Sequence, residues 1–349
     1  MNYLDELAKK PAEWIITEGP LSHTVISSRI RLARNLAGHR FAQKAKSDEL
    51  EQVAQKVIDA TKNTHTFQKS AVVRLEETSP LERRLLLERH LVSQELAKGG
   101  KARAVIIGGN ETYGIMVNEE DHIRMQCITP GFAIQDAWAS LNKVDDELDN
   151  ELAYAFLPEW GYLTACPTNV GTGIRASVML HLPALAITKQ IDSVLQKVSQ
   201  AGLAVRGFYG EGSEASGDLY QISNQITLGQ TEEDLVLTIE TFVKQIIGRE
   251  QNCRKQLLKE AKSKAEDVVY RAWGVLTNAR LINSRESMKL ISHLRLGISY
   301  QWIDMSFSKL NELLLMIQPA HLQKSTQKDL DETERDILRA NIIRKMLVH

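Results

Sequence analysis

The chain has 349 residues, and its 43 lysines and arginines against 44 aspartates and glutamates give a formal net charge of -1 at pH 7. This balance argues against a general nucleic-acid binder, because such proteins need a surplus of basic surface to release counterions. Hydrophobic residues make up 43% and charged residues 25% of the chain. That composition is typical of a globular protein and argues against a mainly disordered chain. The length suffices for about two domains.

No apolar run approaches the roughly 20 residues of a membrane helix, and the first residues lack the basic and apolar regions of a signal peptide. We therefore expect a cytoplasmic protein that does not bind a membrane. The three cysteines, Cys127, Cys166 and Cys253, are odd in number and widely spaced, which fits neither a disulfide framework nor a zinc cage. The nine histidines show no ligand spacing, so we expect no metal site built from protein side chains.

Three segments of the first part alternate like strands with one polar face. With a period of two, residues 25–32 place Ile26, Ile30 and Leu32 opposite Ser27, Arg29 and Arg31. In residues 120–127 the pattern groups Glu120, His122, Arg124 and Gln126 against Ile123, Met125 and Cys127, and in residues 174–181 it groups Arg175 and Ser177 against Ile174, Ala176, Val178 and Leu180. The arginine falls on the polar side each time.

Arginines on three polar strand faces favour a phosphate-binding sheet, because a guanidinium holds phosphate with two hydrogen bonds and keeps its charge. The alternative is a solvated sheet face with ordinary surface salt bridges. The common nucleotide signatures are missing: there is no G-x-x-x-x-G-K-[ST] segment, no eukaryotic-type kinase catalytic loop and no D-F-G. If ATP binds, it binds by another scheme.

Residues 206–217 contain four glycines at positions 207–217 together with Glu211 and Glu214. Such a segment forms either a floppy surface loop or a lid that closes over a ligand. The two glutamates next to Arg206 favour a lid that brings a carboxylate onto a cationic substrate.

A long helix is predicted to begin near Thr231, an N-cap residue followed by Glu232 and Glu233. Leu235, Ile239, Phe242, Ile246, Leu257 and Leu258 keep roughly helical spacing along it. After residue 253 only two of the 20 glycines and one of the eight prolines remain, which indicates long helices with few breaks. We predict a mixed α+β domain over residues 1–253 and an all-helical domain over residues 254–349, with the long helix as the bridge.

Four ordered blocks resemble the signature segments of the phosphagen (guanidino) kinases. They are Ser27-Ser28-Arg29-Ile30-Arg31, Asn118-Glu119-Glu120-Asp121-His122-Ile123-Arg124, Cys166-Pro167-Thr168-Asn169-Val170-Gly171-Thr172-Gly173-Ile174-Arg175-Ala176-Ser177, and Arg206-Gly207 through Glu211. The resemblance implies an antiparallel sheet flanked by helices, akin to glutamine synthetase, and transfer of the ATP γ-phosphoryl group to a guanidinium nitrogen.

Two departures narrow the resemblance. Phosphagen kinases carry a helical domain before the S-x-R-x-R segment, whereas here that segment starts at Ser27 and the extra chain follows the catalytic part. This order is similar to the bacterial protein-arginine kinases, whose substrate is an arginine side chain on a protein. An open site fits such a substrate, because a lid that seals around a small guanidino compound would exclude a polypeptide.

The resemblance assigns Arg29, Arg31, Arg124, Arg175 and Arg206 to the ATP phosphates and His90 to the nucleotide. The full set that it implies for ATP is Ser27, Ser28, Arg29, Ile30, Arg31, His90, Arg124, Arg175, Ala176, Ser177, Val178, Met179, Arg206, Gly207, Phe208, Tyr209, Gly210 and Glu211. Without the resemblance, His90 is equally a helix-surface histidine.

For the guanidinium, the resemblance implies Glu120 as the carboxylate that holds it and takes its proton, and Glu211 as the lid carboxylate opposite, with Glu214 as the alternative. Cys166 would lie beside the guanidinium, or else be a buried small hydrophobe. Two carboxylates can orient a guanidinium and accept its proton as the bond to phosphorus forms. Mg²⁺ would bridge the phosphates and be held largely by ATP and water.

In the last part, residues 331–340 are predicted to open a helix with an acidic first turn. Arg335 and Arg339 are four residues apart and so lie on one face of this helix. This spacing alone indicates a solvated face with ion pairs. The pattern Arg335-Asp336-x-x-Arg339-Ala340 resembles the phosphoarginine-sensing motif of the protein-arginine kinases, which implies allosteric regulation.

The sequence therefore predicts a cytoplasmic ATP-dependent protein-arginine kinase. The resemblance further implies substrates delivered to the Clp unfoldase-protease, a zinc-binding activator protein, and a homodimer or higher homo-oligomer. The alternatives are a small-molecule guanidino kinase and a catalytically silent adaptor that binds and inhibits a partner. Retention of Glu120, Glu211 and all five arginines speaks against the adaptor, which needs none of them together.

Overall fold

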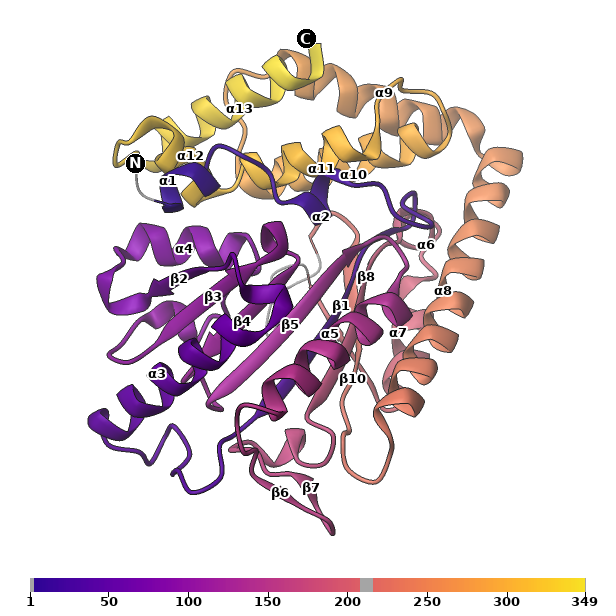
Figure 1. The fold of residues 1–349 in the computed structure, drawn as a ribbon. Helices are drawn as coiled ribbons and strands as arrows, with labels where there is room; N and C mark the ends of the chain where they lie inside the picture. The colour runs from indigo at the N-terminus through magenta and orange to yellow at the C-terminus, as the bar shows by residue number, and fades with distance from the viewer. Residues whose placement is uncertain (1–2, 208–215, 349) are drawn as a thin grey trace.

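The computed structural model describes residues 3–207 and 216–348. A large antiparallel sheet lies beneath a layer of helices formed by the last part of the chain (Figure 1). Within the described residues, eight strands follow the spatial order β2-β3-β4-β5-β1-β8-β10-β9, and each neighbouring pair is antiparallel. The expected α+β class with an antiparallel sheet, flanking helices and a helical last part is confirmed.

The eight strands are short to medium in length, and a separate two-stranded hairpin projects from one edge of the fold (Figure 1). Their bounds are β1 Val25–Arg34, β2 Ala71–Arg74, β3 Ala104–Gly108, β4 Tyr113–Val117, β5 Ile123–Pro130, β8 Ile174–His181, β9 Leu203–Arg206 and β10 Leu219–Asn224, with β6 Phe156–Leu157 and β7 Gly161–Tyr162 in the hairpin.

The helices before the last part are α1 Tyr3–Leu7, α2 Glu13–Ile16, α3 Ser47–Asn63, α4 Pro80–Glu88, α5 Ile134–Asp149, α6 Pro183–Ile187 and α7 Ile191–Gln200. Those of the last part are α8 Glu232–Glu260, α9 Lys262–Asn278, α10 Ser284–Ser299, α11 Phe307–Met316, α12 Pro319–Thr326 and α13 Glu332–Val348. Short 3-10 turns are η1 His65–Phe67, η2 Leu75–Glu77, η3 Leu96–Lys98, η4 Gly109–Glu111 and η5 Pro167–Asn169. No helix in these described stretches has the length and apolar character needed to span a membrane.

One face of the sheet is covered by α3, α5 and α8 and contains the largest apolar core. Ile30 and Leu32 of β1 and Ile174, Ala176, Val178 and Leu180 of β8 point into it, as the alternation of these segments predicts. β-branched residues suit such strands because they pack well on a pleated surface.

The helical layer formed by α9 to α13 packs against the opposite face at one end of the sheet. Its own core joins α9, α10, α11 and α13 and includes Ile26, Met179 and Leu219 from the strands. Val105, Ile107 and Met116 also pack on this face, against α1 and α4, and the arginine side chains occupy another part of it. The packing therefore gives the sheet a dry side and a functional side.

The prediction that Ile26 lies on the same face of β1 as Ile30 and Leu32 is wrong. The register shifts between Val25 and Ser27, as in a β-bulge, and an extra residue of this kind moves a side chain to the other face. Val25 therefore joins Ile30 in the main core, whereas Ile26 lies with Met179 on the side of the helical layer.

Helix α8 begins as expected, with the hydroxyl of Thr231 accepting a hydrogen bond from the backbone N–H of Asp234 at 3.1 Å. It continues to Glu260 and leads into α9 along one side of the molecule (Figure 1). Leu257 is buried but Leu258 is 36% exposed, so Leu258 is wrongly placed in the predicted apolar stripe. A boundary at residue 253 falls inside α8, and the division into two domains stays a prediction.

Candidate active site

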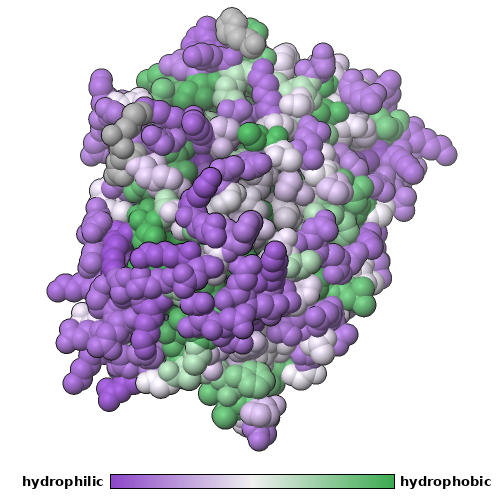
Figure 2. Space-filling view, in the orientation of Figure 1, coloured by the Kyte–Doolittle hydropathy of each residue, from purple (hydrophilic) through white to green (hydrophobic). Residues whose placement is uncertain are grey.

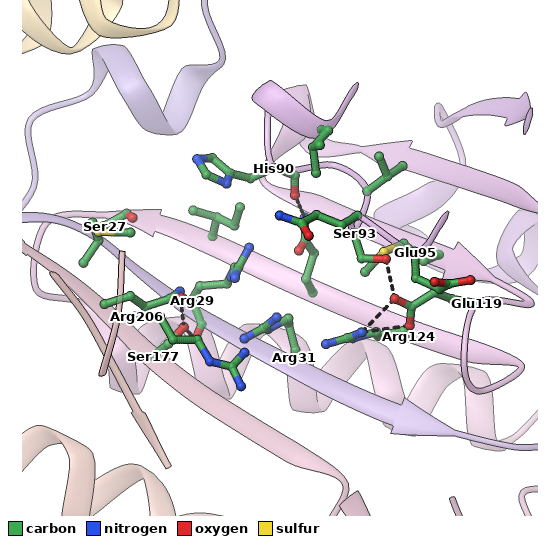
Figure 3. Close-up of a pocket in the computed structure, with 18 of the residues that line it drawn as sticks. Ser27, Arg29, Arg31, His90, Ser93, Glu95, Glu119, Arg124, Ser177 and Arg206 are labelled. Carbon is green, nitrogen blue, oxygen red and sulfur yellow. Dashed lines mark hydrogen bonds and ion pairs between the residues drawn. The ribbon is translucent and has the colours of Figure 1, made fainter. Parts of the chain in front are cut away.

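A cavity of about 410 Å³ opens on the functional side of the sheet, in the size range of small-ligand sites. Three of its arginines, Arg29 and Arg31 of β1 and Arg124 of β5, lie in a row along the strands (Figure 3). Arg206, at the end of β9, lies beside Arg29 in the same view. We call this cavity the arginine pocket; its other lining residues are Trp14, Ile26, Ser27, Leu87, His90, Val92, Ser93, Gln94, Glu95, Lys98, Met116, Glu119, Gln126, Ile128, Ser177, Met179 and Gln221.

The arginine pocket concentrates positive charge in a buried place. Burial, followed by repulsion from Arg124, Arg175 and Arg206, lowers the pKa of Arg29 to about 9. Burial, followed by repulsion from Arg29 and the other arginines, lowers the pKa of Arg31 well below its ordinary value. Since a guanidinium does not lose its proton in a protein, the direction of these pKa shifts indicates repulsion between the cations, which a bound anion would relieve.

Unsatisfied donors add to this repulsion. Within the described part of the chain, Nε of Arg29 and both Nε and Nη2 of Arg31 are buried without a hydrogen-bond partner. Buried polar groups are nearly always paired in folded proteins. These three nitrogens therefore mark the pocket as a site for a ligand rich in acceptor oxygens.

Arg175, the fifth predicted arginine, lies opposite Arg31 in the pairing of β8 with β1. Its Nε and Nη2 donate to the hydroxyl of Ser223 on β10, at 3.3 and 3.1 Å. Its charge contributes to the depressed pKa of Arg29 and of Arg31. The five arginines of the sequence prediction are thus brought together.

Two aromatic rings, those of Trp14 and His90, line another part of the arginine pocket, which we call its aromatic end. The ring of His90 stands 5.9 Å from the ring of Trp14, tilted by 57°, and His90 has a left-handed backbone with φ of +59°. Burial, then Arg29 and Arg31, lowers the pKa of His90 to about 3, so the imidazole is neutral at physiological pH. His90 is a pocket residue and not a helix-surface residue, and Trp14 is a neighbour that the sequence did not reveal.

Arg124 pairs with Glu119 and not with Glu120, which the alternation had grouped with it. Nη1 of Arg124 donates to both carboxylate oxygens of Glu119, at 2.9 and 2.8 Å, and Ser93 donates to the same carboxylate. Burial opposes ionisation of Glu119, but Arg124 and Ser93 outweigh it and lower its pKa. The alternation fails here because β5 begins only at Ile123.

His122 also departs from the predicted polar face. It is fully buried, its Nδ1 accepts from the backbone N–H of Leu36 at 3.1 Å, and its Nε2 lies 2.8 Å from the carbonyl oxygen of Arg40. A turn precedes it, since Asn118 has φ of +55° and its N–H donates to the carbonyl of His122. His122 therefore anchors the end of β1 instead of lining the pocket.

Glu120 lies next to Cys166, beyond the Arg124 end of the pocket. A hydrogen bond from Cys166 and the charge of Arg124 favour ionised Glu120, but burial and the neighbouring Asp121 and Glu119 together raise its pKa above the ordinary value. The Sγ of Cys166 is also 3.0 Å from the hydroxyl of Thr168. Cys166 is partly exposed, so it is not a buried small hydrophobe.

Asp121 connects the acidic segment that contains Glu120 to the loop that carries Cys166. Its Oδ1 accepts from Nδ2 of Asn35 at 2.6 Å and from the backbone N–H of Ala165 at 2.7 Å. The acidic segment before β5 is thereby fixed to the loop that carries Cys166. This placement puts a carboxylate of raised pKa next to a thiol and within the electrostatic influence of Arg124.

Several residues of the implied ATP set lie elsewhere. The side chains of Ile30, Ala176 and Val178 point into the main core, and the hydroxyl of Ser28 donates to the carbonyl of Gly131 at 2.9 Å. Ser27, Ser177 and Met179 line the pocket, and Gly207 follows Arg206 at the end of β9. Phe208, Tyr209, Gly210, Glu211 and Glu214 lie outside the described residues.

The predicted sensing motif lies on α13, far along the chain from the pocket. Arg339 is 2% exposed, and its guanidinium donates to the carbonyls of Ile317 at 3.1 Å and Ile282 at 3.0 Å and pairs with Asp336. Arg335 is partly exposed and donates to the carbonyl of Leu330 at 2.7 Å. The two arginines thus differ in burial although they lie one turn apart.

Comparison with known families agrees with this geometry. Residues 52–253 match the family model described as ATP:guanido phosphotransferase, C-terminal catalytic domain, and residues 262–349 match the protein-arginine kinase McsB C-terminal domain. The chain belongs to the protein-arginine kinase family. It is therefore a kinase of the ATP:guanidino phosphotransferase class.

Curated relatives with the name protein-arginine kinase are similar over nearly the full chain. The protein from Halothermothrix orenii is 44% identical over 348 residues, covering 99% of both chains. The protein from Bacillus subtilis is 44% identical over 342 residues, covering 96% of this chain and 93% of that protein.

Among solved structures, the duplicated taurocyamine kinase from Schistosoma mansoni with bound transition-state analogue components is similar, with a TM-score of 0.61 and 25% identity. The match covers 72% of this chain and 39% of that one. Lombricine kinase matches with a TM-score of 0.58 and 26% identity over 70% of each chain. Both support the phosphagen-kinase fold.

Proposed function

We propose that the arginine pocket binds ATP and that the chain transfers the γ-phosphoryl group to the guanidinium of arginine side chains in proteins. The observation that carries the proposal is the cluster of five arginines, two of them with buried unpartnered N–H groups, beside a carboxylate of raised pKa. Triphosphate oxygens would satisfy those donors and relieve the repulsion between the guanidiniums. The adenine would pack at the aromatic end, against Trp14 and neutral His90.

Glu120 would act on the acceptor. Its carboxylate would orient the substrate guanidinium and accept one proton as the nitrogen attacks phosphorus. The N–P bond forms as the bond from phosphorus to the β–γ bridging oxygen breaks, and ADP leaves with that oxygen. Glu211, or Glu214 in its place, would hold the guanidinium from the lid side, and Cys166 would contact it beside Glu120.

Mg²⁺ would supply charge neutralisation at the phosphates. Within the described residues, no cluster of three His, Cys, Asp or Glu side chains could hold a metal ion by itself. The pocket carboxylate of Glu119 is engaged by Arg124 and Ser93. In this proposal the magnesium ion would be held by phosphate oxygens and water.

Several consequences of this function rest on the family resemblance. We propose that the products are recognised by a Clp unfoldase-protease, that a zinc-binding protein activates the kinase, and that the kinase works in the cytoplasm as a homodimer or larger assembly. We also propose that Arg335, Asp336, Arg339 and Ala340 form a phosphoarginine-responsive element. The partial exposure of Arg335 on α13 supports that role, whereas Arg339 would act from below the surface.

The direct test is incubation of the protein with ATP, Mg²⁺ and an unfolded protein, followed by mapping of phosphorylated residues at neutral pH, which spares the acid-labile N–P bond. Phosphate on arginine side chains is the expected result. Free arginine, creatine and taurocyamine serve as parallel substrates. Phosphate found only on a free guanidino compound would replace the proposal with a small-molecule guanidino kinase.

A further inference from the structure

The hairpin β6–β7 and the loop after β10 expose an unusual concentration of apolar side chains. Five of the sixteen large exposed hydrophobic residues of the described chain fall within residues 156–160 and 226–228. We call them the apolar rim: Phe156 is 51% exposed, Leu157 44%, Trp160 55%, Ile226 57% and Leu228 45%. In Figure 2 a hydrophobic patch lies at the lower edge of the molecule, where Figure 1 places the hairpin.

The hairpin is joined directly to the loop that carries Cys166. Tyr162 of β7 exchanges backbone hydrogen bonds with Gly171, at 2.7 and 3.3 Å, and so closes the segment 163–170. That segment contains Cys166 and η5. The apolar residues of the hairpin therefore lie directly before the Cys166 loop, residues 163–170.

The loop after β10 supports the same segment from the other side. The side chain of Thr227 is buried, and its hydroxyl lies 2.9 Å from the carbonyl of Thr168 and 2.7 Å from that of Val170. The residues on either side of Thr227, Ile226 and Leu228, are both exposed. One residue thus anchors the Cys166 loop while its two neighbours present apolar surface.

Two glycines bring these three segments into backbone contact. Gly161 has φ of +76°, and a Cβ added there would lie 2.6 Å from the carbonyl oxygen of Gly171. Gly171 has φ of +108°, and a Cβ added there would lie 2.6 Å from the carbonyl oxygen of Thr227 and 2.9 Å from Cα of Leu228. The hairpin, the Cys166 loop and the loop after β10 are therefore layered side by side, which places the two groups of apolar rim residues on adjoining segments.

The segments that carry the apolar rim hold acidic residues and no lysine or arginine. The sequence holds no lysine or arginine between Lys143 and Arg175 or between Arg206 and Lys244. Glu159 in the hairpin and Glu233 and Asp234 at the start of α8 are exposed. Such a surface attracts a chain that carries an arginine and repels an acidic one.

We infer that the apolar rim is the docking surface for the polypeptide substrate, and that it selects arginines flanked by apolar or aromatic residues, as exposed in unfolded chains. The inference rests on the proposed function and adds the substrate class to it. An extended chain whose arginine reaches Glu120 and Cys166 has its neighbouring residues over this surface, because the rim is built onto the Cys166 loop itself. Exposed apolar patches beside a site commonly mark a binding surface.

The test uses two peptides of equal length and charge, each with one arginine, flanked in one by Leu and Phe and in the other by Gly and Ser. Wild-type protein should show a KM about tenfold lower for the apolar peptide. The double variant Trp160→Ser/Ile226→Ser should raise that KM to the value for the Gly/Ser peptide, while the kcat at saturation and the KM for ATP stay unchanged. Trp160→Phe/Ile226→Val should keep the preference.

The matched control is Tyr270→Ser/Val72→Ser, which removes one aromatic and one β-branched residue at exposed positions of α9 and β2, 51% and 42% exposed. It should behave as wild type. Equal KM values for the two peptides with the wild-type protein would overturn the inference, as would an unchanged preference in the Trp160/Ile226 variant. A changed oligomeric state in sedimentation, with peptide kinetics intact, would instead make the rim a contact between copies of this chain.

Fluorescence anisotropy with labelled peptides separates this inference from the proposed function, because binding needs no phosphoryl transfer. Selective binding of the apolar peptide without phosphorylation would retain the docking surface and reject the function. Phosphorylation without selectivity would reject the surface and retain the function. Loss of both would reject both.

Discussion

Arg31 holds a positive charge in a buried position among other arginines. Its pKa is depressed by burial and by Arg29, Arg124, Arg175 and Arg206, and two of its nitrogens have no partner within the described structure. A charge whose ionised form is disfavoured in the folded protein lowers the free energy of unfolding. Binding function and stability are therefore opposed at this residue.

Arg31→Met should accordingly stabilise the ligand-free protein by about 1–3 kcal/mol, because an apolar group replaces an uncompensated buried charge. The same variant should weaken ATP binding at least about tenfold, since one charged contact with phosphate is worth about 1.5–3 kcal/mol. Thermal unfolding with and without ATP measures both effects. Arg271→Met, at an exposed position on α9, is the control, and a lower melting temperature for ligand-free Arg31→Met would contradict the prediction.

Glu120→Gln should lower kcat by about 10² or more while ATP still raises the melting temperature, because the general base is lost and the phosphate contacts are kept. The base works only when ionised. Since burial, Asp121 and Glu119 raise the pKa of Glu120, wild-type activity should fall on acidification at a pH above the ordinary carboxylate range. Glu233→Gln, exposed at the start of α8, should leave both the rate and the pH profile intact; activity of Glu120→Gln within twofold of wild type would remove Glu120 from the mechanism.

At the scale of elements, the alternation of β8 could be predicted from the sequence because the strand is regular from Ile174 to His181. The ion pair between Arg124 and Glu119 could not be predicted, because the turn at Asn118 breaks the alternation and brings Glu119 to Arg124. Trp14 reaches the pocket from α2, more than 70 residues before His90 in the chain. Such long-range contacts leave no periodic signal in the sequence.

Helix α13 offers a test of which motif arginine is structural. Arg339→Ala should destabilise the protein by about 3–5 kcal/mol, because it leaves two buried carbonyls and the carboxylate of Asp336 without their partner. Arg335→Ala should cost about 1 kcal/mol or less, since its side chain is partly exposed. Urea unfolding measures both. If Arg335→Ala alone abolishes phosphoarginine binding in calorimetry, the sensing role belongs to the exposed arginine; similar unfolding midpoints for the two variants would contradict the structural assignment of Arg339.

At the scale of the whole molecule, the helical last part is fixed to the sheet by buried polar contacts as well as by apolar packing. Glu88 at the end of α4 accepts from the backbone N–H groups of Ala320 and His321 at 2.9 and 3.2 Å. The next residue, Arg89, pairs with Glu111 and contacts His321. His90 follows Arg89 directly in the chain, so the residue that contacts helix α12 is the neighbour of a residue at the aromatic end of the arginine pocket.

A second buried contact lies at the end of β8, where Nε2 of His181 is 2.9 Å from the hydroxyl of Ser292 on α10. Ser292 in turn donates to Asp218 at 2.6 Å. Burial, followed by the charges of Arg295, Arg254 and His293, lowers the pKa of His181 well below its ordinary value. The imidazole is therefore neutral in the folded protein at physiological pH.

This depressed pKa makes the attachment of the helical part to the sheet sensitive to acid. An unfolded chain binds a proton at His181 below its ordinary pKa of about 6.5, whereas the folded protein does not. The stability that neutral His181 contributes is complete well above pH 6.5 and is lost as the pH falls through 6.5, by a slope that approaches about 1.4 kcal/mol for each pH unit. His181→Gln should keep a hydrogen bond to Ser292 and should lose about 1 kcal/mol less stability than wild type between pH 6.5 and 5.5, because the unfolded imidazole is already half protonated at pH 6.5. Denaturant unfolding at the two pH values measures the difference. The control His65→Gln, at an exposed position, should lose as much stability as wild type. Equal losses of stability for His181→Gln and wild type would show that His181 takes up its proton without unfolding.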